Sequence, residues 1–257
     1  LAGSALDYIC EERINDVFYN FQDKESLAKS AVVVTMVAGD TIKTFGESFI
    51  PFYNPKKTER NKYICDYLIV KKGDAIEDKR IILEENGHKV SGREKLLEEK
   101  RFSALMPLLA PSRLLGKDRQ SLFSYRLLKP DKIMGRRVHV VEALPKARDG
   151  GGISSGKIWI DEKNSQILKI EIEGMPLEGY ESVLNEITKY TMEPRFTTTY
   201  LYQIEKNGLM FPGLMEVRVG YPYPGSTEGF YLKKIRTDVT YGKYKFFAVE
   251  TESRVIK

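Results

Sequence analysis

Apolar and polar positions alternate through the second half of the chain. Successive side chains of a β-strand point to opposite faces, so odd and even positions can be read separately. Within 165–173, leucine and isoleucine at every second position oppose lysine and glutamate, and 196–204 and 230–241 keep the same period with many aromatic residues. This pattern predicts sheets with one apolar face and one wet face.

Strands of this kind fill most of the chain. We expect them at 31–38, 45–52, 61–71, 75–85, 121–129, 135–145, 156–161, 165–173, 196–206, 209–221, 228–241 and 243–252. Short turns separate them, among them Asn86-Gly87, Lys206-Asn207-Gly208 and Tyr241-Gly242-Lys243. Successive strands joined by short turns indicate an antiparallel meander, and the lack of alternation with long helices argues against doubly wound and barrel α/β folds.

Helical patterns are few. Residues 4–21 carry apolar side chains at helical spacing, and 91–101 is a run of charged, strong helix formers. The apolar segment Phe102–Leu115 follows and is interrupted by Pro107 and Pro111. We therefore expect one domain over 1–257, in which 1–60 is an N-terminal helix plus strand extension.

The large apolar sheet surface needs a cover. Residues 63–70 are apolar on both faces apart from Asp66, so this strand must be covered on both sides or curl around a cavity. The helix at 4–21 and the segment 91–116 can plug a concave sheet without filling it, which leaves room for an apolar ligand. The alternative is that they fill it completely and the aromatic side chains are simply core.

Composition changes this picture little. Of 257 residues, 42% are hydrophobic, and 15 Tyr and 12 Phe stand against one Trp, a balance that favours strands. The 41 basic and 36 acidic residues give a net charge of +5 without any long run of like charge, so nucleic-acid binding has little support. No apolar stretch reaches the length of about eighteen residues that a transmembrane helix needs.

Two short features bear on location. Residues 1–20 carry charges throughout, so we recognise no signal peptide there, but Ser4 of Leu1-Ala2-Gly3-Ser4 stands where a bacterial lipobox has its cysteine. An engineered substitution, a cloning scar or chance would each explain that match. Cys10 and Cys65 fit either one disulfide in an oxidising compartment or two buried free thiols.

Catalytic patterns are weak. His88 follows a turn and His139 lies between two valines of a strand, and neither has a nucleophile or metal ligands at a motif spacing. Residues 151–157 begin like a phosphate-binding loop, but Ile158 stands where Ser or Thr is required, and a strand follows instead of a helix. We expect no enzyme, metal or cofactor; an envelope hydrolase remains an alternative without a motif behind it.

Four motifs resemble a known family. They are Gly135–Glu142 with Leu144–Lys146, Gly156–Asp161 with Ile167–Glu171, Gly208–Pro212, and Val239–Phe246. They are similar to the LolA/LolB-type outer-membrane lipoprotein carriers, the related regulator RseB and longer lipoprotein-sorting proteins. The resemblance implies a mainly β (α+β) fold, an open half-barrel of one large curved antiparallel sheet with helices plugging its concave face. It also implies a periplasmic or cell-envelope location, with outer-membrane anchoring of the native form as one option.

The function that we expect is a carrier or binding protein for lipid or lipoprotein acyl chains. The candidate ligand-binding residues are Phe102, Leu105, Met106 and Leu109 in the lid segment Phe102–Leu115, and Phe196, Tyr200 and Tyr202 on the sheet. The alternative is a sensor or interaction module of the RseB kind, which binds an envelope protein partner.

Overall fold

A large β-sheet dominates the structure, a computed structural model. It describes residues 7–20, 27–38, 41–53, 57–72, 75–90, 107, 110–146, 155–174, 195–222 and 231–247; for 20, 27–38, 41–53, 57, 71–72, 75–76, 221–222 and 231–234 only the backbone is described. The elements in chain order are β1 (Tyr8–Asn20), β2 (Leu27–Ala38), β3 (Thr41–Tyr53), β4 (Lys57–Lys72), β5 (Ala75–Glu85), β6 (His88–Lys89), α1 (Ala110–Leu115), η3 (Gln120–Leu122), β7 (Phe123–Leu127), β8 (Asp131–Ile133), β9 (Arg136–Pro145), β10 (Ser155–Asp161), β11 (Ile167–Glu173), β12 (Arg195–Lys206), β13 (Leu209–Pro222) and β14 (Tyr231–Phe246).

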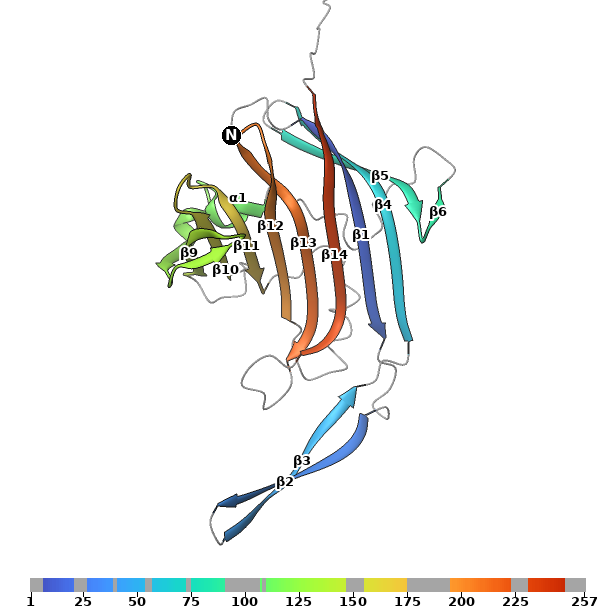
Figure 1. Cartoon of the computed structure of the whole chain (residues 1–257), viewed down its shortest axis with the longest axis vertical. Coiled ribbons are helices and arrows are strands. Elements are labelled where there is room, and N and C mark those ends of the chain that lie inside the picture. Colours follow the sequence, from blue (N-terminus) through green and yellow to red (C-terminus); the bar gives the residue numbers. More distant parts are fainter. Residues whose placement is uncertain are drawn as a thin grey trace, which may run out of the picture.

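The main sheet has twelve strands in the order β6-β5-β4-β1-β14-β13-β12-β11-β10-β9-β7, and β8 pairs with β9 beside this path. Every neighbouring pair in it is antiparallel. The long strands curve strongly, and β6 and β7 lie at opposite ends of the path, so the described sheet is not closed into a barrel (Figure 1). The prediction of one large, open antiparallel sheet is confirmed.

The helix predicted over 4–21 is wrong. Residues Tyr8–Asn20 form β1, which lies between β4 and β14, so this segment is an interior strand of the main sheet and not a helical extension. The pattern misled because Glu12 and Asp16 lie on the buried face of β1, where alternation would call for apolar residues. The strands expected at 31–38 and 45–52 are present as β2 and β3, which pair only with each other among the described strands and extend beyond the main sheet (Figure 1).

The turn predicted at Tyr241-Gly242-Lys243 is also wrong. β14 runs through these residues as one strand and pairs with β1 on both sides of them, Tyr8 opposite Phe246 and Glu12 opposite Tyr241. The register shifts between Ile9 and Glu11, and Lys243 has φ of 54°, so the irregularity is a β-bulge. By contrast, the turns at Asn86-Gly87 and Asn207-Gly208 are confirmed, with positive φ at both residues of each pair.

One face of the main sheet, here called the inner face, carries the core. Cross-strand partners share a face, so the register places Tyr200 of β12, Met215 of β13 and Val239 of β14 side by side on it. The core runs from β5 to β7 and comprises Tyr8, Cys10, Ile14, Tyr63, Cys65, Tyr67, Ile69, Ile82, Ala110, Leu114, Phe123, Ala143, Ile158, Ile170, Ile172, Phe196, Tyr200, Tyr202, Phe211, Met215, Val217, Val219, Ile235, Val239 and Tyr241. A smaller cluster of Val138, Val140, Trp159 and Leu168 packs under β8.

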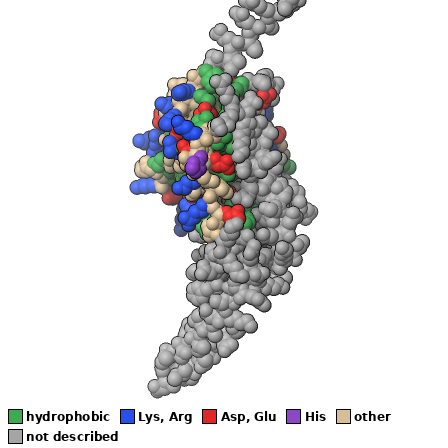
Figure 2. Space-filling model, turned by 90° about the vertical axis from the view of Figure 1, so that its right-hand side faces the viewer, with side chains coloured by type: hydrophobic (Ala, Val, Ile, Leu, Met, Phe, Trp, Pro, Cys, Tyr) green, Lys and Arg blue, Asp and Glu red, His purple; other side chains and the backbone are tan. Residues whose placement is uncertain are grey.

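The opposite, outer face is charged along β13 and β14. Arginine or lysine pairs with an acid two positions away on one strand, as in Arg236 with Asp238 (2.7 Å) and Arg218 with Glu216 (3.0 Å). Figure 2 shows Lys and Arg side chains interspersed with Asp and Glu on the described part of one side of the molecule. Such exposed pairs keep a surface wet and contribute little to stability.

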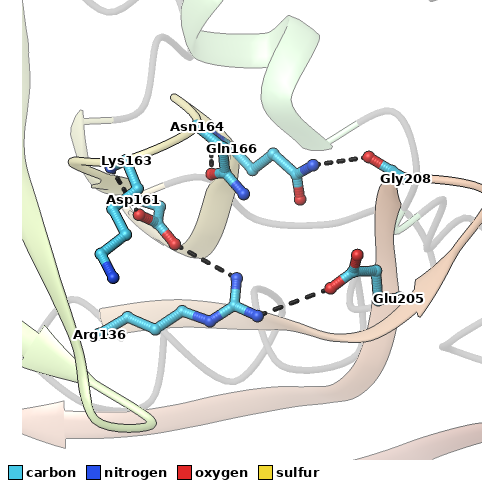
Figure 3. A network of polar contacts seen from close by, with 7 residues as sticks. All are labelled: Arg136, Asp161, Lys163, Asn164, Gln166, Glu205 and Gly208. Atoms are coloured by element: carbon cyan, nitrogen blue, oxygen red, sulfur yellow. Dashed lines mark hydrogen bonds and ion pairs between the residues drawn. The ribbon is translucent and has the colours of Figure 1, made fainter.

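A polar network joins three turns at one end of the sheet (Figure 3). The Asp161 carboxylate at the end of β10 accepts hydrogen bonds from the Lys163 backbone N–H (2.8 Å) and from Arg136 at the start of β9 (3.2 Å). Arg136 also lies 3.6 Å from Glu205 of β12. Gln166 donates to the Gly208 carbonyl (2.6 Å), which ties the β10–β11 turn to the β12–β13 turn. The network connects neighbouring hairpins, and it holds β9 to β13 in register at the end of the sheet where these turns lie.

We predict that Asp161→Asn lowers the melting temperature in a pH-dependent way. The Lys163 N–H and then Arg136 lower the pKa of Asp161 below its ordinary 3.8. The ionised form therefore favours the folded state above that ordinary value, and its contribution is lost as the pH falls through the lower folded-state pKa. Thermal unfolding of both proteins between about pH 3 and pH 7 should show a gap that closes towards pH 3, whereas the exposed neighbour variant Glu162→Gln should show a smaller gap. An Asp161→Asn gap of constant size would contradict this account.

Candidate functional site

The part of the predicted lid that the structure describes lies on the inner face. It consists of Pro107 and α1, and within it Ala110 and Leu114 are fully buried. A Cβ atom at Gly156 of β10 would lie 2.5 Å from Cδ1 of Leu114, so only glycine leaves room for this leucine. Pro111 is tolerated because it lies in the first turn of α1, where its missing N–H costs no intrahelical hydrogen bond.

Three hydrogen bonds to the described part of this lid end on its backbone carbonyls. The Tyr202 hydroxyl of β12 donates to the Pro107 carbonyl (2.9 Å), and the Tyr125 hydroxyl of β7 donates to the Leu114 carbonyl (2.6 Å). Gln120 donates to the Leu115 carbonyl (2.9 Å). These three bonds fix the position of the lid backbone, and the buried side chains of Ala110 and Leu114 provide its apolar cover.

The predicted sheet residues Phe196, Tyr200 and Tyr202 lie together on the inner face of β12, and all three are buried. Burial raises the pKa of Tyr200 to about 12 and that of Tyr202 well above its ordinary value, so both stay protonated at neutral pH. The structure thus brings Tyr202 against the lid but buries all three side chains in the core. The other four predicted residues, Phe102, Leu105, Met106 and Leu109, lie outside the described residues.

An aromatic cluster that we did not predict lies on the inner face, and its residues come from β1, β13 and β14. Tyr8 lies 5.8 Å from Phe211, 5.2 Å from Tyr244 and 5.9 Å from Phe246 between ring centroids. The cluster was missed because Tyr8 was assigned to a helix. The available signal was the β-forming residues at both ends of Tyr8–Asn20.

A buried ion pair adjoins this cluster, and the sequence pattern gave no sign of it. Nε of Arg80 on β5 lies 2.8 Å from the Glu12 carboxylate of β1, and its NH1 lies 3.0 Å from Asp78. The Arg80 guanidinium also lies over the Tyr67 ring, 4.0 Å from its centroid. Burial by itself would lower the pKa of Arg80, but the Glu12 carboxylate, Tyr67 and Tyr241 together outweigh that effect and raise it, so the arginine is always charged.

Cys10 and Cys65 are both buried free thiols. In the register of β1 with β4, Cys10 lies opposite Tyr67 and Cys65 lies opposite Glu12. The two cysteines are therefore diagonal neighbours on the inner face. Diagonal neighbours lie about 7–8 Å apart, beyond the usual Cα separation of a disulfide. Burial raises the pKa of both thiols, that of Cys65 to about 12. The structure has the second of the two alternatives, a pair of buried free thiols.

The histidines, the possible metal ligands and the phosphate-loop match can be located in the part of the chain that the structure describes. No group of three or more His, Cys, Asp or Glu residues there could hold a metal ion. His88 and His139 are both exposed. β10 follows residues 151–154 directly, so a strand occupies the place where a phosphate-binding loop needs a helix. No described helix is long and apolar enough to cross a membrane.

No family model and no curated protein matches the chain. Among solved structures, it is similar to an outer membrane lipoprotein-sorting protein domain from Vibrio parahaemolyticus, with a TM-score of 0.40 and 14% identity over 95% of this chain and 86% of that one. It is also similar to a LolA superfamily protein from Nitrosomonas europaea (TM-score 0.34, 10% identity, 96% and 88% covered) and a DUF1329 family protein from Desulfovibrio piger (TM-score 0.34, 12% identity, 95% and 87% covered). Two of these three belong to the class that the sequence motifs resemble; likenesses of this size carry no argument about ligand or partner.

We predict that Glu12→Gln destabilises the protein strongly. Removing the Glu12 charge breaks the buried pair and leaves Arg80 with Asp78. Breaking a buried pair typically costs about 3–5 kcal/mol, and the remaining carboxylate should hold the loss towards the lower end of that range. The matched control is Glu11→Gln, on the opposite face of the same strand, whose partners Arg13 and Lys243 are exposed. That variant should cost no more than about 1 kcal/mol. Urea unfolding of both variants checks this, and equal losses would show that the buried pair has no special role.

Proposed function

We propose that this chain is a cell-envelope binding protein that holds the acyl chains of a lipid or lipoprotein on its inner face. In this proposal the segment Phe102–Leu115 is a lid that the ligand displaces, and Phe196, Tyr200 and Tyr202 line the site beneath it. The observation that carries the proposal is the docking of Leu114 over Gly156 on a part of the inner face that is mostly aromatic and aliphatic.

The proposal needs a movable lid, because the lining side chains are buried when the lid is in place. The described lid is held by Leu114, Ala110 and three hydrogen bonds. A buried leucine contributes roughly 2 kcal/mol and a hydrogen bond about 1 kcal/mol. Burial of a methylene contributes about 0.8 kcal/mol, so a long acyl chain offers more than enough apolar surface to replace these contacts.

The location that we propose is the periplasm or the cell envelope, with outer-membrane anchoring of the native form as one option. A protein partner of the kind that RseB binds remains compatible with this location. Acyl binding is favoured over partner binding as the main role because the described lid covers an apolar face, which suits a fatty chain more than a folded surface.

Lipid analysis tests the proposal. We expect mass spectrometry of the purified protein to find co-purified lipids, and we expect the delipidated protein to bind a fluorescent fatty-acyl probe. A mainly apolar site should show little salt dependence, which separates this binding from charge attraction at the outer face. Absence of both co-purified lipid and probe binding would end the carrier proposal.

A lid variant makes the test specific. Tyr202→Phe removes the hydrogen bond to the Pro107 carbonyl and keeps the ring, so it weakens the closed lid by about 1 kcal/mol. We expect the affinity for the acyl probe to rise roughly fivefold, because a ligand that needs an open lid no longer competes with that bond. Tyr244→Phe is the matched control, since its hydroxyl donates to the Pro212 carbonyl within the sheet. Unchanged or weaker binding by Tyr202→Phe would show that this lid does not gate the site.

A further inference from the structure

Two tyrosine hydroxyls on the inner face are buried without a hydrogen bond of ordinary length. Tyr8 of β1 and Tyr67 of β4 are fully buried, and in the part of the chain that the structure describes neither hydroxyl has a partner within hydrogen-bond distance, although burial and then the nearby Asp78 carboxylate raise the pKa of Tyr67. Buried polar atoms are nearly always hydrogen-bonded, so an unpartnered one calls for an explanation, and two on adjoining strands call for a common one. The register places Tyr67 opposite Cys10 and Tyr8 opposite Ile69, so the two tyrosines are diagonal neighbours on one face.

The other hydroxyls of this region do have partners. The Tyr244 hydroxyl donates to the Pro212 carbonyl (2.7 Å), and the Tyr241 hydroxyl lies 4.0 Å from the Met215 sulfur. Tyr8 is close to Tyr244, with ring centroids 5.2 Å apart, yet its hydroxyl is not part of these contacts. The orphaned hydroxyls are therefore a local feature of Tyr8 and Tyr67 and not a property of the whole aromatic cluster.

Charge limits what these hydroxyls can bind. Among the described residues, Arg80 is the cation of the ion-pair cluster, and it lies between two carboxylates, Glu12 at 2.8 Å and Asp78 at 3.0 Å. The cluster thus has one more negative than positive charge, so it repels an anionic headgroup. Burial raises the pKa of Tyr8 well above its ordinary value, so this hydroxyl stays protonated and can donate. A protonated phenol in such surroundings suits an uncharged hydrogen-bond acceptor.

We propose that the hydroxyls of Tyr8 and Tyr67 donate hydrogen bonds to the ester carbonyl oxygens of a bound acyl lipid. The inference rests on the proposed acyl-binding function and adds the position of the uncharged polar end of the ligand. The aromatic surface continues from Tyr8 to Phe211, 5.8 Å away, and Pro212 next to it pairs with Tyr202 under the lid. An acyl chain can therefore run from a carbonyl at β1 and β4 towards the lid at β12 without leaving apolar surface.

A matched pair of ligands tests this inference. Dipalmitoylglycerol and its dialkyl ether analogue carry the same chains and the same free hydroxyl, and they differ in the two carbonyl groups. We expect the wild-type protein to bind the diester about tenfold more tightly than the diether, which is about 1.4 kcal/mol. Tyr8→Phe should remove most of this preference by weakening diester binding alone, and Tyr67→Phe should act in the same direction.

Stability measurements separate this effect from misfolding. Because the Tyr8 hydroxyl has no described partner, Tyr8→Phe should leave the melting temperature unchanged or raise it. Tyr244→Phe is the control, because it removes a hydroxyl that has a partner; it should lower the melting temperature and keep the ester preference.

Three results would overturn the inference. They are equal binding of diester and diether by the wild-type protein, equal loss of both ligands in Tyr8→Phe, and an unchanged ester preference in both Tyr→Phe variants. The acyl-binding function would survive each of them. If the wild-type protein binds neither ligand, the function and the inference fall together. The same comparison can be made with a synthetic peptide whose cysteine sulfur carries either the dipalmitoylglyceryl group or its dialkyl ether analogue. Tighter binding of the peptide than of free dipalmitoylglycerol indicates a lipoprotein ligand, and the reverse indicates a free glycerolipid. A preference for the ester over the ether in either ligand series supports the inference.

Discussion

The structure depends on one constraint: a large apolar sheet face must be covered, and the strands of an open sheet cannot cover it themselves. Hydrogen bonding organises the twelve strands, but the burial of the inner face provides the stabilisation, because the outer face carries mostly exposed ion pairs. An open sheet cannot shield its own face as a closed barrel does, so segments outside the sheet must lie against it. The six-residue helix α1 is the described example, and the missing side chain of Gly156 leaves the space that Leu114 of α1 occupies.

The inner face is not uniformly apolar, and its exceptions gather at one end. Around β1, β4 and β5 it buries a salt bridge, two thiols and two tyrosine hydroxyls without described partners. Buried ion pairs rarely stabilise a fold more than well-packed hydrophobic residues do, so stability alone gives little reason to place one there. A face that is apolar under the lid and polar at the other end matches the two ends of an acyl ester, and the stability of the empty protein does not require that arrangement.

Much of the fold could be predicted from the sequence. From β4 onward the alternation of side chains and the Asn-Gly turns define the hairpins, because both signals are local and the two faces differ in polarity. Prediction failed where a buried position carries a charged side chain. Glu12 and Asp16 point into the core of β1, Glu12 to meet Arg80 and Asp16 to accept from Thr237 (2.6 Å), so alternation disappeared and a helical spacing took its place. The bulge at Lys243 was predicted as a turn because glycine and positive φ occur in both turns and β-bulges.

The candidate site was only partly accessible to sequence reasoning. Periodicity placed Phe196, Tyr200 and Tyr202 on one face, but nothing in it told a core residue from a ligand contact, and the partner of Arg80 depends on contacts between distant strands. The central claim is that a fatty chain replaces the lid on the inner face. Hydrogen–deuterium exchange of the protein with and without dipalmitoylglycerol tests it most directly. The account predicts faster exchange in residues 110–116 on binding, with β1, β4 and β13 unchanged or slower; no change in 110–116 at saturating lipid would contradict it.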